Sequence, residues 1–129
     1  MAYNILIVDD SAVTREVMAR TCKLSGIELG EVFKAAHGGE ALALLNEHWV
    51  DLILTDINMP VMDGMQLVEE LSRRDGLRSI PVVIVSTEGS RTRMDELSQK
   101  GIRAYIRKPF TPEQIAAVMQ EVLGVEYEQ

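Results

Sequence analysis

The chain has 129 residues, a formal net charge of −7 and a pI near 4.8. This length fits one domain over residues 1–129, with no linker and no effector domain attached. The acidic balance argues against binding to nucleic acid or to anionic lipid. The single cysteine, Cys22, excludes an internal disulfide, and no segment reads as a signal peptide or a membrane span. We therefore expect a cytoplasmic domain.

Five short aliphatic runs alternate along the chain with segments of helical periodicity. The runs lie at residues 5–8, 32–36, 52–55, 82–85 and 104–106. Because they are apolar without alternation, they predict strands that are buried on both faces of a parallel sheet.

The first two helices are predicted from cap residues and apolar spacing. Ser11 is a candidate N-cap for the first helix, and Gly26 is its expected stop. Its predicted apolar face comprises Val13, Val17, Thr21 and Leu24. A second helix is expected near residues 39–47.

Three further helices are predicted after the third strand. One begins at Gly64 and buries Leu67, Val68 and Leu71. A weaker one covers residues 90–101. The last begins with Thr111-Pro112-Glu113-Gln114, which supplies an N-cap, a proline at the first helical position and a capping-box glutamine.

Five consecutive strand–helix units predict an α/β fold with a parallel sheet and helices on both faces. In such sheets a ligand binds outside the carboxyl ends of the strands. Polar residues follow four of the five predicted strands at that edge: Asp9 and Asp10, Asp56, Ser86, and Lys108.

Three carboxylates at one edge repel one another unless a cation lies between them. Oxygen ligands that leave room for water suit Mg²⁺. Lys108 adds a second positive charge and Ser86 a hydroxyl donor. This set of groups favours phosphoryl transfer, with a carboxylate as the nucleophile and an acyl phosphate as the product.

Several segments resemble the receiver domains of bacterial two-component response regulators, particularly the stand-alone chemotaxis type. They are Ile7-Val8-Asp9-Asp10-Ser11, Leu54-Thr55-Asp56-Ile57-Asn58-Met59-Pro60, Met62-Asp63-Gly64, Val85-Ser86-Thr87-Glu88 and Ile106-Arg107-Lys108-Pro109-Phe110. The resemblance covers nearly the whole chain. It implies a flavodoxin-like (βα)5 domain whose five strands lie in the order 2-1-3-4-5.

The resemblance also implies a role for each site residue. Asp56 is the expected phosphoacceptor, and Lys108 contacts the phosphoryl group. The expected Mg²⁺ ligands are Asp10 directly, Asp9 through water, Asp56 and the backbone carbonyl of Asn58. Ser86 and Tyr105 are the expected switch pair, Asn58 and Glu88 the residues that tune self-dephosphorylation, and Lys108-Pro109 an expected cis peptide bond.

The expected partners are a sensor histidine kinase or phosphotransfer protein as donor and a downstream target protein. The target is expected to bind the fourth helix, fifth strand and fifth helix of a monomer, with dimerisation after phosphorylation left open. Alternatives are a phosphate sink, a phosphorelay intermediate, or an aspartate-nucleophile phosphatase. A flavin or dinucleotide module is disfavoured because no G-x-G-x-x-G follows a strand.

His37 and His48 are expected on the surface away from the site. Trp49 is expected to be a packing residue.

Overall fold

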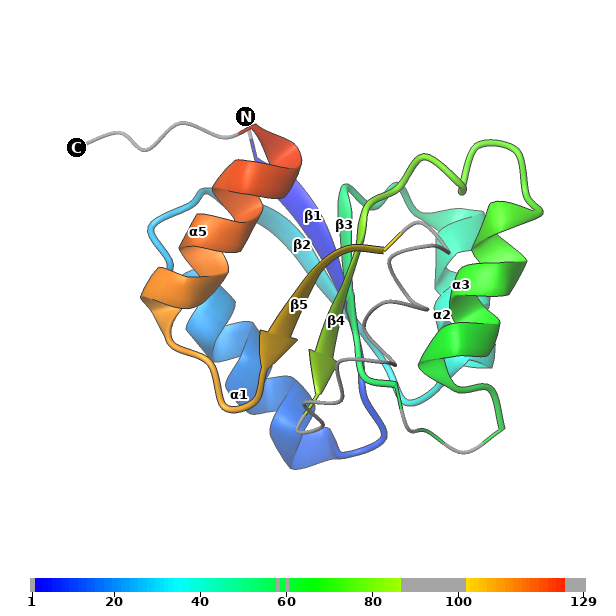
Figure 1. Ribbon diagram of the computed structural model, residues 1–129, viewed down its shortest axis with the longest axis horizontal. Coiled ribbons are helices and arrows are strands. Elements are labelled where there is room, and N and C mark those ends of the chain that lie inside the picture. Colours follow the sequence, from blue (N-terminus) through cyan, green and yellow to red (C-terminus); the bar gives the residue numbers. More distant parts are fainter. Residues whose placement is uncertain (1, 58, 60, 87–101, 125–129) are drawn as a thin grey trace.

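Parallel pairing joins five strands into one sheet in the order β2-β1-β3-β4-β5 (Figure 1). The computed structural model describes residues 2–57, 59, 61–86 and 102–124. The strands are β1 (Tyr3–Val8), β2 (Leu29–Ala35), β3 (Leu52–Thr55), β4 (Val82–Ser86) and β5 (Ile102–Arg107). Within the described residues the helices are α1 (Ala12–Lys23), α2 (Gly38–Glu47), α3 (Gly64–Ser72) and α5 (Pro112–Leu123). The flavodoxin-like fold and its strand order are therefore confirmed.

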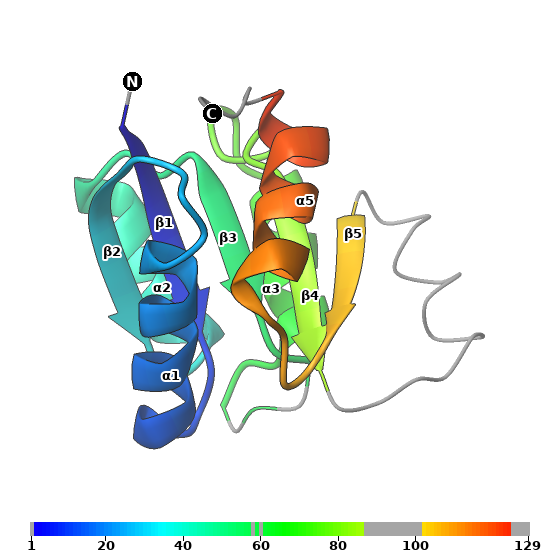
Figure 2. The same ribbon diagram turned by 90° about the vertical axis from the view of Figure 1, so that its left-hand side faces the viewer.

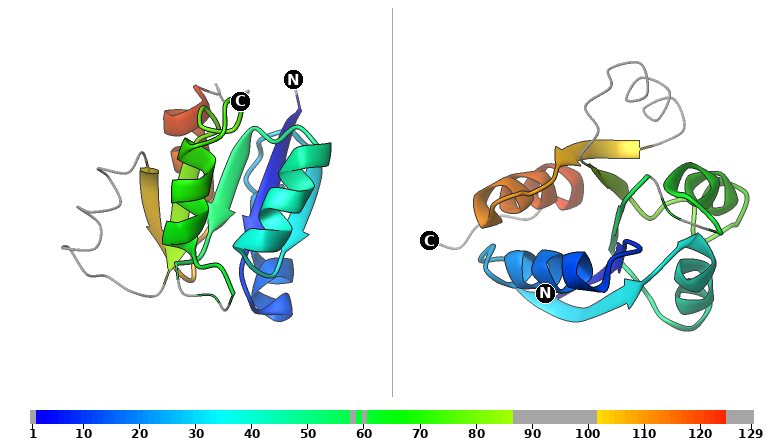
Figure 3. Two further views of the ribbon diagram at one scale, coloured as in Figure 1. Left: turned by 90° about the vertical axis from the view of Figure 1, so that its right-hand side faces the viewer. Right: turned by 90° about the horizontal axis from the view of Figure 1, so that it is seen from below.

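Helices cover both faces of the sheet. Figure 2 shows α1 and α5 in front of one face, and Figure 3 shows α2 and α3 on the other. All five strands run in the same direction, so their carboxyl ends meet at the lower edge in Figure 1. The helix expected at residues 90–101 lies outside the described residues. No helix in the described ranges is long and apolar enough to cross a membrane.

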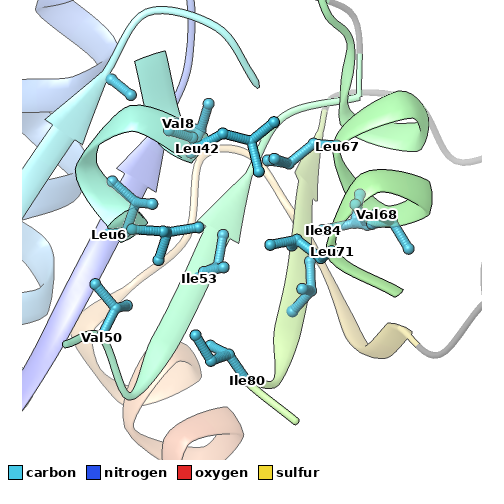
Figure 4. Close-up of a cluster of buried hydrophobic side chains, with 14 of the residues drawn as sticks. Leu6, Val8, Leu42, Val50, Ile53, Leu67, Val68, Leu71, Ile80 and Ile84 are labelled. Carbon is cyan, nitrogen blue, oxygen red and sulfur yellow. The ribbon is translucent and has the colours of Figure 1, made fainter. Parts of the chain in front are cut away.

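Successive strand residues point to opposite faces and so build two separate cores. One hydrophobic cluster lies under α2 and α3. It contains Leu6, Ile53 and Ile84 from the strands and Leu67 and Leu71 from α3 (Figure 4). Ile5, Ile7, Leu52, Leu54, Val83 and Val85 belong to the cluster under α1 and α5. All of these strand side chains are inaccessible to solvent. Burial on both faces explains why β1, β3 and β4 appear in the sequence as largely unbroken apolar runs. For the edge strands β2 and β5 the prediction of burial on both faces was wrong, because several of their residues are exposed to solvent.

The orientation of α1 corrects one sequence prediction. The residues that α1 buries are Met18, Ala19 and Cys22. The predicted apolar face is instead turned to solvent, and the Val13 side chain is 74% exposed. Helical periodicity identifies residues that share a face, but both faces of this helix carry apolar groups. Met18, Ala19 and Cys22 belong to the core cluster under α1 and α5, so their face is the one that packs on the sheet.

The starts of α3 and α5 agree with their predicted caps. Asp63 and Gln66 form a complete capping box at α3. Thr111 and Gln114 form another at α5, with Pro112 at the first helical position. The α2 helix uses an unusual cap, His37, whose Nδ1 accepts from two backbone amides.

His48 is exposed as predicted, and its ring stacks on Phe33 with centroids 4.6 Å apart. The prediction for Trp49 was wrong, because this side chain is 62% exposed. Its indole N–H donates a hydrogen bond to Asp51 Oδ1 over 2.8 Å at the surface.

Candidate functional site

Strand pairing brings the aspartates of β1 and β3 together. The register pairs Val8 with Thr55, so Asp9 and Asp56 emerge side by side from neighbouring strands. The Asp56 amide donates to the Val8 carbonyl over 2.9 Å, which fixes this junction. Asp9, Asp10 and Asp56 each offer a carboxylate oxygen, and these oxygens all lie within 4.8 Å of one another.

Lys108 enters the same edge from β5. Its backbone amide donates to the Ser86 carbonyl over 3.0 Å, so β4 positions the residue that follows β5. Lys108 Nζ lies 2.5 Å from Asp9 Oδ2 and 3.1 Å from Asp56 Oδ2. The Lys108-Pro109 bond is cis, as the resemblance implied.

The pKa of Lys108 reflects two opposing influences. Burial is the largest single influence and disfavours the ammonium form. The hydrogen bonds and negative charges of Asp9 and Asp56 together outweigh it, so the pKa is raised above its usual value. Lys108 therefore remains a cation at neutral pH.

The buried aspartate of the site is held by its backbone as well as by its carboxylate. Asp9 is 1% exposed, and its Oδ1 accepts from the Ser11 amide over 2.9 Å. Its amide donates to the Ala35 carbonyl over 3.0 Å. Arg15 Nη1 donates to the Asp9 carbonyl oxygen over 2.6 Å. Arg15 was missed from the sequence, because its bond to the Asp9 carbonyl depends on where β2 stops relative to β1.

Asp56 sits in a tight junction between β3 and α3. Its Oδ1 accepts from the Ile57 amide over 2.7 Å, which leaves Oδ2 facing Lys108. The Gly64 backbone lies so close to Asp56 that a Cβ at this position would be only 2.3 Å from the Asp56 carbonyl oxygen. The 13% exposed side chain of Asp56 is thus oriented rather than free.

The donor set fits a hard divalent cation. Three carboxylates against the one ammonium of Lys108 leave an excess of two negative charges, which a divalent ion would balance. Oxygen ligands of this kind suit Mg²⁺, and the exposed Asp10 leaves the cluster open to solvent. The acidic cluster therefore fits a metal site.

The predicted switch residues lie on neighbouring strands. Ser86 is 1% exposed at the end of β4, and Tyr105 of β5 packs against the core cluster beneath α2 and α3. The Tyr105 hydroxyl is buried and has no hydrogen-bond partner in the described part of the structure. The tuning pair, Asn58 and Glu88, lies outside the described residues.

A parallel sheet of order 2-1-3-4-5 with an acidic, lysine-containing pocket at its carboxyl edge is typical of phosphoryl-accepting signalling domains. Residues 5–120 match the family model of the response regulator receiver domain. The chain therefore belongs to the response regulator receiver family, whose members act in two-component signalling. Membership implies a regulatory domain that accepts a phosphoryl group.

Individual relatives come from bacterial chemotaxis. The chain is 35% identical to a chemotaxis protein CheY homologue of Campylobacter jejuni, over 94% of this chain and 92% of that protein. It is 34% identical to chemotaxis protein CheY1 of Helicobacter pylori, over 94% of this chain and 97% of that protein. The structure of Vibrio cholerae CheY4 superposes with a TM-score of 0.84 at 33% identity, covering 95% and 99% of the two chains.

Proposed function

We propose that Asp56 accepts a phosphoryl group from a sensor histidine kinase or phosphotransfer protein in a Mg²⁺-dependent reaction. The observation that carries this proposal is the contact of one ammonium, Lys108 Nζ, with both Asp9 and Asp56 inside a three-carboxylate cluster. Three neighbouring carboxylates repel one another, so the cluster by itself does not stabilise the fold. A bound cation would offset this repulsion and could also bind an incoming phosphoryl group.

The two oxygens of Asp56 have different surroundings. Oδ1 is engaged by the Ile57 amide, so Oδ2 is the oxygen that faces the pocket. In the proposed reaction Oδ2 forms the new bond to phosphorus. The bond from phosphorus to the donor imidazole breaks, and its electron pair stays on that nitrogen. Lys108 then exchanges its contact with Asp56 for a phosphoryl oxygen.

Asp9, Asp10, Asp56 and the backbone carbonyl of Asn58 would hold the metal ion. Bound Mg²⁺ supplies neutralisation of charge on the phosphoryl oxygens during transfer. Lys108 would contribute the same kind of stabilisation, as a preorganised cation in a partly buried site.

The proposed output is a conformational switch. Ser86 would move toward the phosphoryl group, and Tyr105 would fill the space that it vacates. The Tyr105 hydroxyl is buried and has no hydrogen-bond partner among the described residues. A buried hydroxyl without a partner costs roughly 1–3 kcal/mol, which is the free-energy scale on which two such conformations differ. The target-binding face would be the fourth helix, β5 and α5. NMR shift changes on adding a phosphoryl mimic are then expected at residues 86–100 and 103–110.

The lifetime of the phosphorylated state is proposed to depend on Asn58 and Glu88. Both are polar, and both would leave a path for the hydrolytic water. We expect Asn58→Arg and Glu88→Tyr each to slow phosphate release about tenfold, since about 1.4 kcal/mol of barrier is tenfold in rate. Equal rates of phosphate release in wild type, Asn58→Arg and Glu88→Tyr would contradict the proposed role of these two residues. The domain would thus catalyse only its own phosphorylation and dephosphorylation.

The surface beside the pocket suits an approaching donor protein. A groove of about 230 Å³ runs between α1 and the loop after β5, with Val13, Val17 and Phe110 among its lining residues. Lys108 lines both this groove and the acidic pocket, so a protein seated here would hold its phosphoryl group near Asp56. Val17→Glu should slow transfer from the kinase while leaving phosphorylation by a small phosphodonor unchanged. Equal slowing of both reactions would contradict this docking surface.

The metal requirement provides the test of the proposed function. Wild type with a small phosphodonor and Mg²⁺ should gain one phosphate by intact mass, and chelation of the metal should prevent it. Asp10→Ala should fail to react, whereas Asp75→Ala, which removes an exposed aspartate elsewhere, should react as wild type does. Unimpaired reaction of Asp10→Ala would contradict the metal site. Rapid turnover of small phosphate esters would instead favour the phosphatase alternative.

A further inference from the structure

Arg15 is a charged side chain beside the acidic pocket that the proposed chemistry does not use. It lies on the first turns of α1, and Nη1 donates to the Asp9 carbonyl oxygen over 2.6 Å. The hydrogen bond therefore joins a side chain of α1 to the backbone that leaves β1. It is a charge-assisted bond, which is stronger than a neutral one.

The Asp9 carbonyl lies where regular strand bonding stops. The Asp9 amide still completes the ladder to Ala35 of β2. However, β2 ends at Ala35, so the ladder does not extend to the Asp9 carbonyl. Arg15 takes the place of the missing strand donor. A buried carbonyl without a donor would carry a free-energy cost, so this bond fixes the local backbone.

The hydrogen bond that fixes the Asp9 carbonyl also fixes the backbone amide of Asp10. The Asp9 carbonyl and the Asp10 amide belong to one planar peptide group. The Asp9 carboxylate is already held by Ser11 and Lys108, but Asp10 is exposed at the rim of the cluster. Arg15 thus controls the peptide plane from which the Asp10 carboxylate projects.

We propose that Arg15 is a positioning residue for the metal site, acting through the Asp9–Asp10 peptide. This inference rests on the proposed function, because it concerns the affinity for Mg²⁺. Its two physical effects have opposite signs. The positive charge of Arg15 repels a cation, so charge alone predicts tighter Mg²⁺ binding when the residue is removed. Positioning predicts weaker binding, since loss of groups that orient metal ligands commonly costs roughly tenfold or more in affinity.

The test measures the Mg²⁺ dissociation constant by calorimetry, without any phosphodonor. We expect Arg15→Met to bind Mg²⁺ about tenfold more weakly than wild type. Arg15→Lys, which keeps the positive charge and can still donate a hydrogen bond, should recover part of the loss. Arg20→Met is the matched control, because Arg20 is an exposed arginine of the same helix, and it should bind as wild type does.

A second readout needs no metal. In the metal-free protein the amides of Asp10 and Ser11 should exchange hydrogen faster in Arg15→Met than in wild type or Arg20→Met. Unchanged or tighter Mg²⁺ binding by Arg15→Met would overturn the inference while leaving the proposed function intact. Absence of Mg²⁺ binding in wild type would instead contradict both. If Arg15→Met does not fold, Arg15→Gln is titrated in its place and the same two outcomes apply.

Discussion

Among the described residues, Lys108 is the one cation that contacts the carboxylates of Asp9 and Asp56, and its removal should lower stability most when no metal is present. Lys108→Met leaves Asp9 and Asp56 without their ammonium partner. Removing one member of a buried ion pair typically costs about 3–5 kcal/mol. The Lys108 side chain is 16% exposed, so the lower end of that range applies, and we expect the free energy of unfolding to fall by about 3 kcal/mol.

Magnesium should reverse part of this loss. A ligand present at a hundred times its dissociation constant stabilises the folded state by about 2.7 kcal/mol. The variant pocket has one fewer positive charge, so Mg²⁺ should bind it more tightly and stabilise it more than wild type. The difference in stability between the two proteins should therefore shrink as Mg²⁺ is added, although the variant should accept phosphate poorly.

Urea unfolding followed by circular dichroism, with and without Mg²⁺, measures these differences. Lys34→Met is the matched control, because Lys34 pairs with Glu16 over 2.7 Å at the surface. Solvent screens exposed pairs of this kind, so this variant should change little in either condition. If Lys108→Met loses no more stability than Lys34→Met, or if Mg²⁺ does not narrow the gap, the electrostatic account of the pocket is wrong.

Three further predictions concern residues around the pocket and in the core. Tyr105→Phe removes a buried hydroxyl that has no hydrogen-bond partner among the described residues, and it should raise the unfolding free energy by up to about 1–3 kcal/mol; a loss of stability in thermal melts would contradict this. Gly64→Ala places a Cβ against the Asp56 carbonyl and should cost about 1–3 kcal/mol and slow phosphorylation, which a normal rate would refute. Burial raises the pKa of Cys22 from 9.0 to about 12, so the unfolded state loses its proton first. Stability should then fall by about 1.4 kcal/mol per pH unit between pH 9 and 12, and Cys22→Ala should remove that part of the slope.

The sequence was most informative where burial leaves a simple pattern. Strands buried on both faces gave unbroken apolar runs, and the range 52–55 coincides with β3. Because parallel strands end at one edge, the residues after those runs also identified the acidic pocket. The caps Thr111 and Asp63 act locally, so their effect can be predicted from a few neighbouring residues.

Features that depend on packing between elements could not be predicted in the same way. Periodicity placed Val13 and Val17 on one face of α1, but which face is buried depends on how α1 packs against the sheet. The bond from Arg15 to the Asp9 carbonyl depends on where β2 stops relative to β1. That the buried Tyr105 hydroxyl has no hydrogen-bond partner among the described residues becomes evident only when the core is assembled.

Locating the phosphate in the modified protein shows whether Asp56 is the residue that accepts the phosphoryl group. Wild type is treated with a small phosphodonor and Mg²⁺, the acyl phosphate is trapped by borohydride reduction, and the modified residue is identified by peptide mass spectrometry. We predict a single modified position at Asp56, and no trapped product in Asp56→Asn. Modification at another residue of wild type, or an equal yield from Asp56→Asn, would contradict the claim.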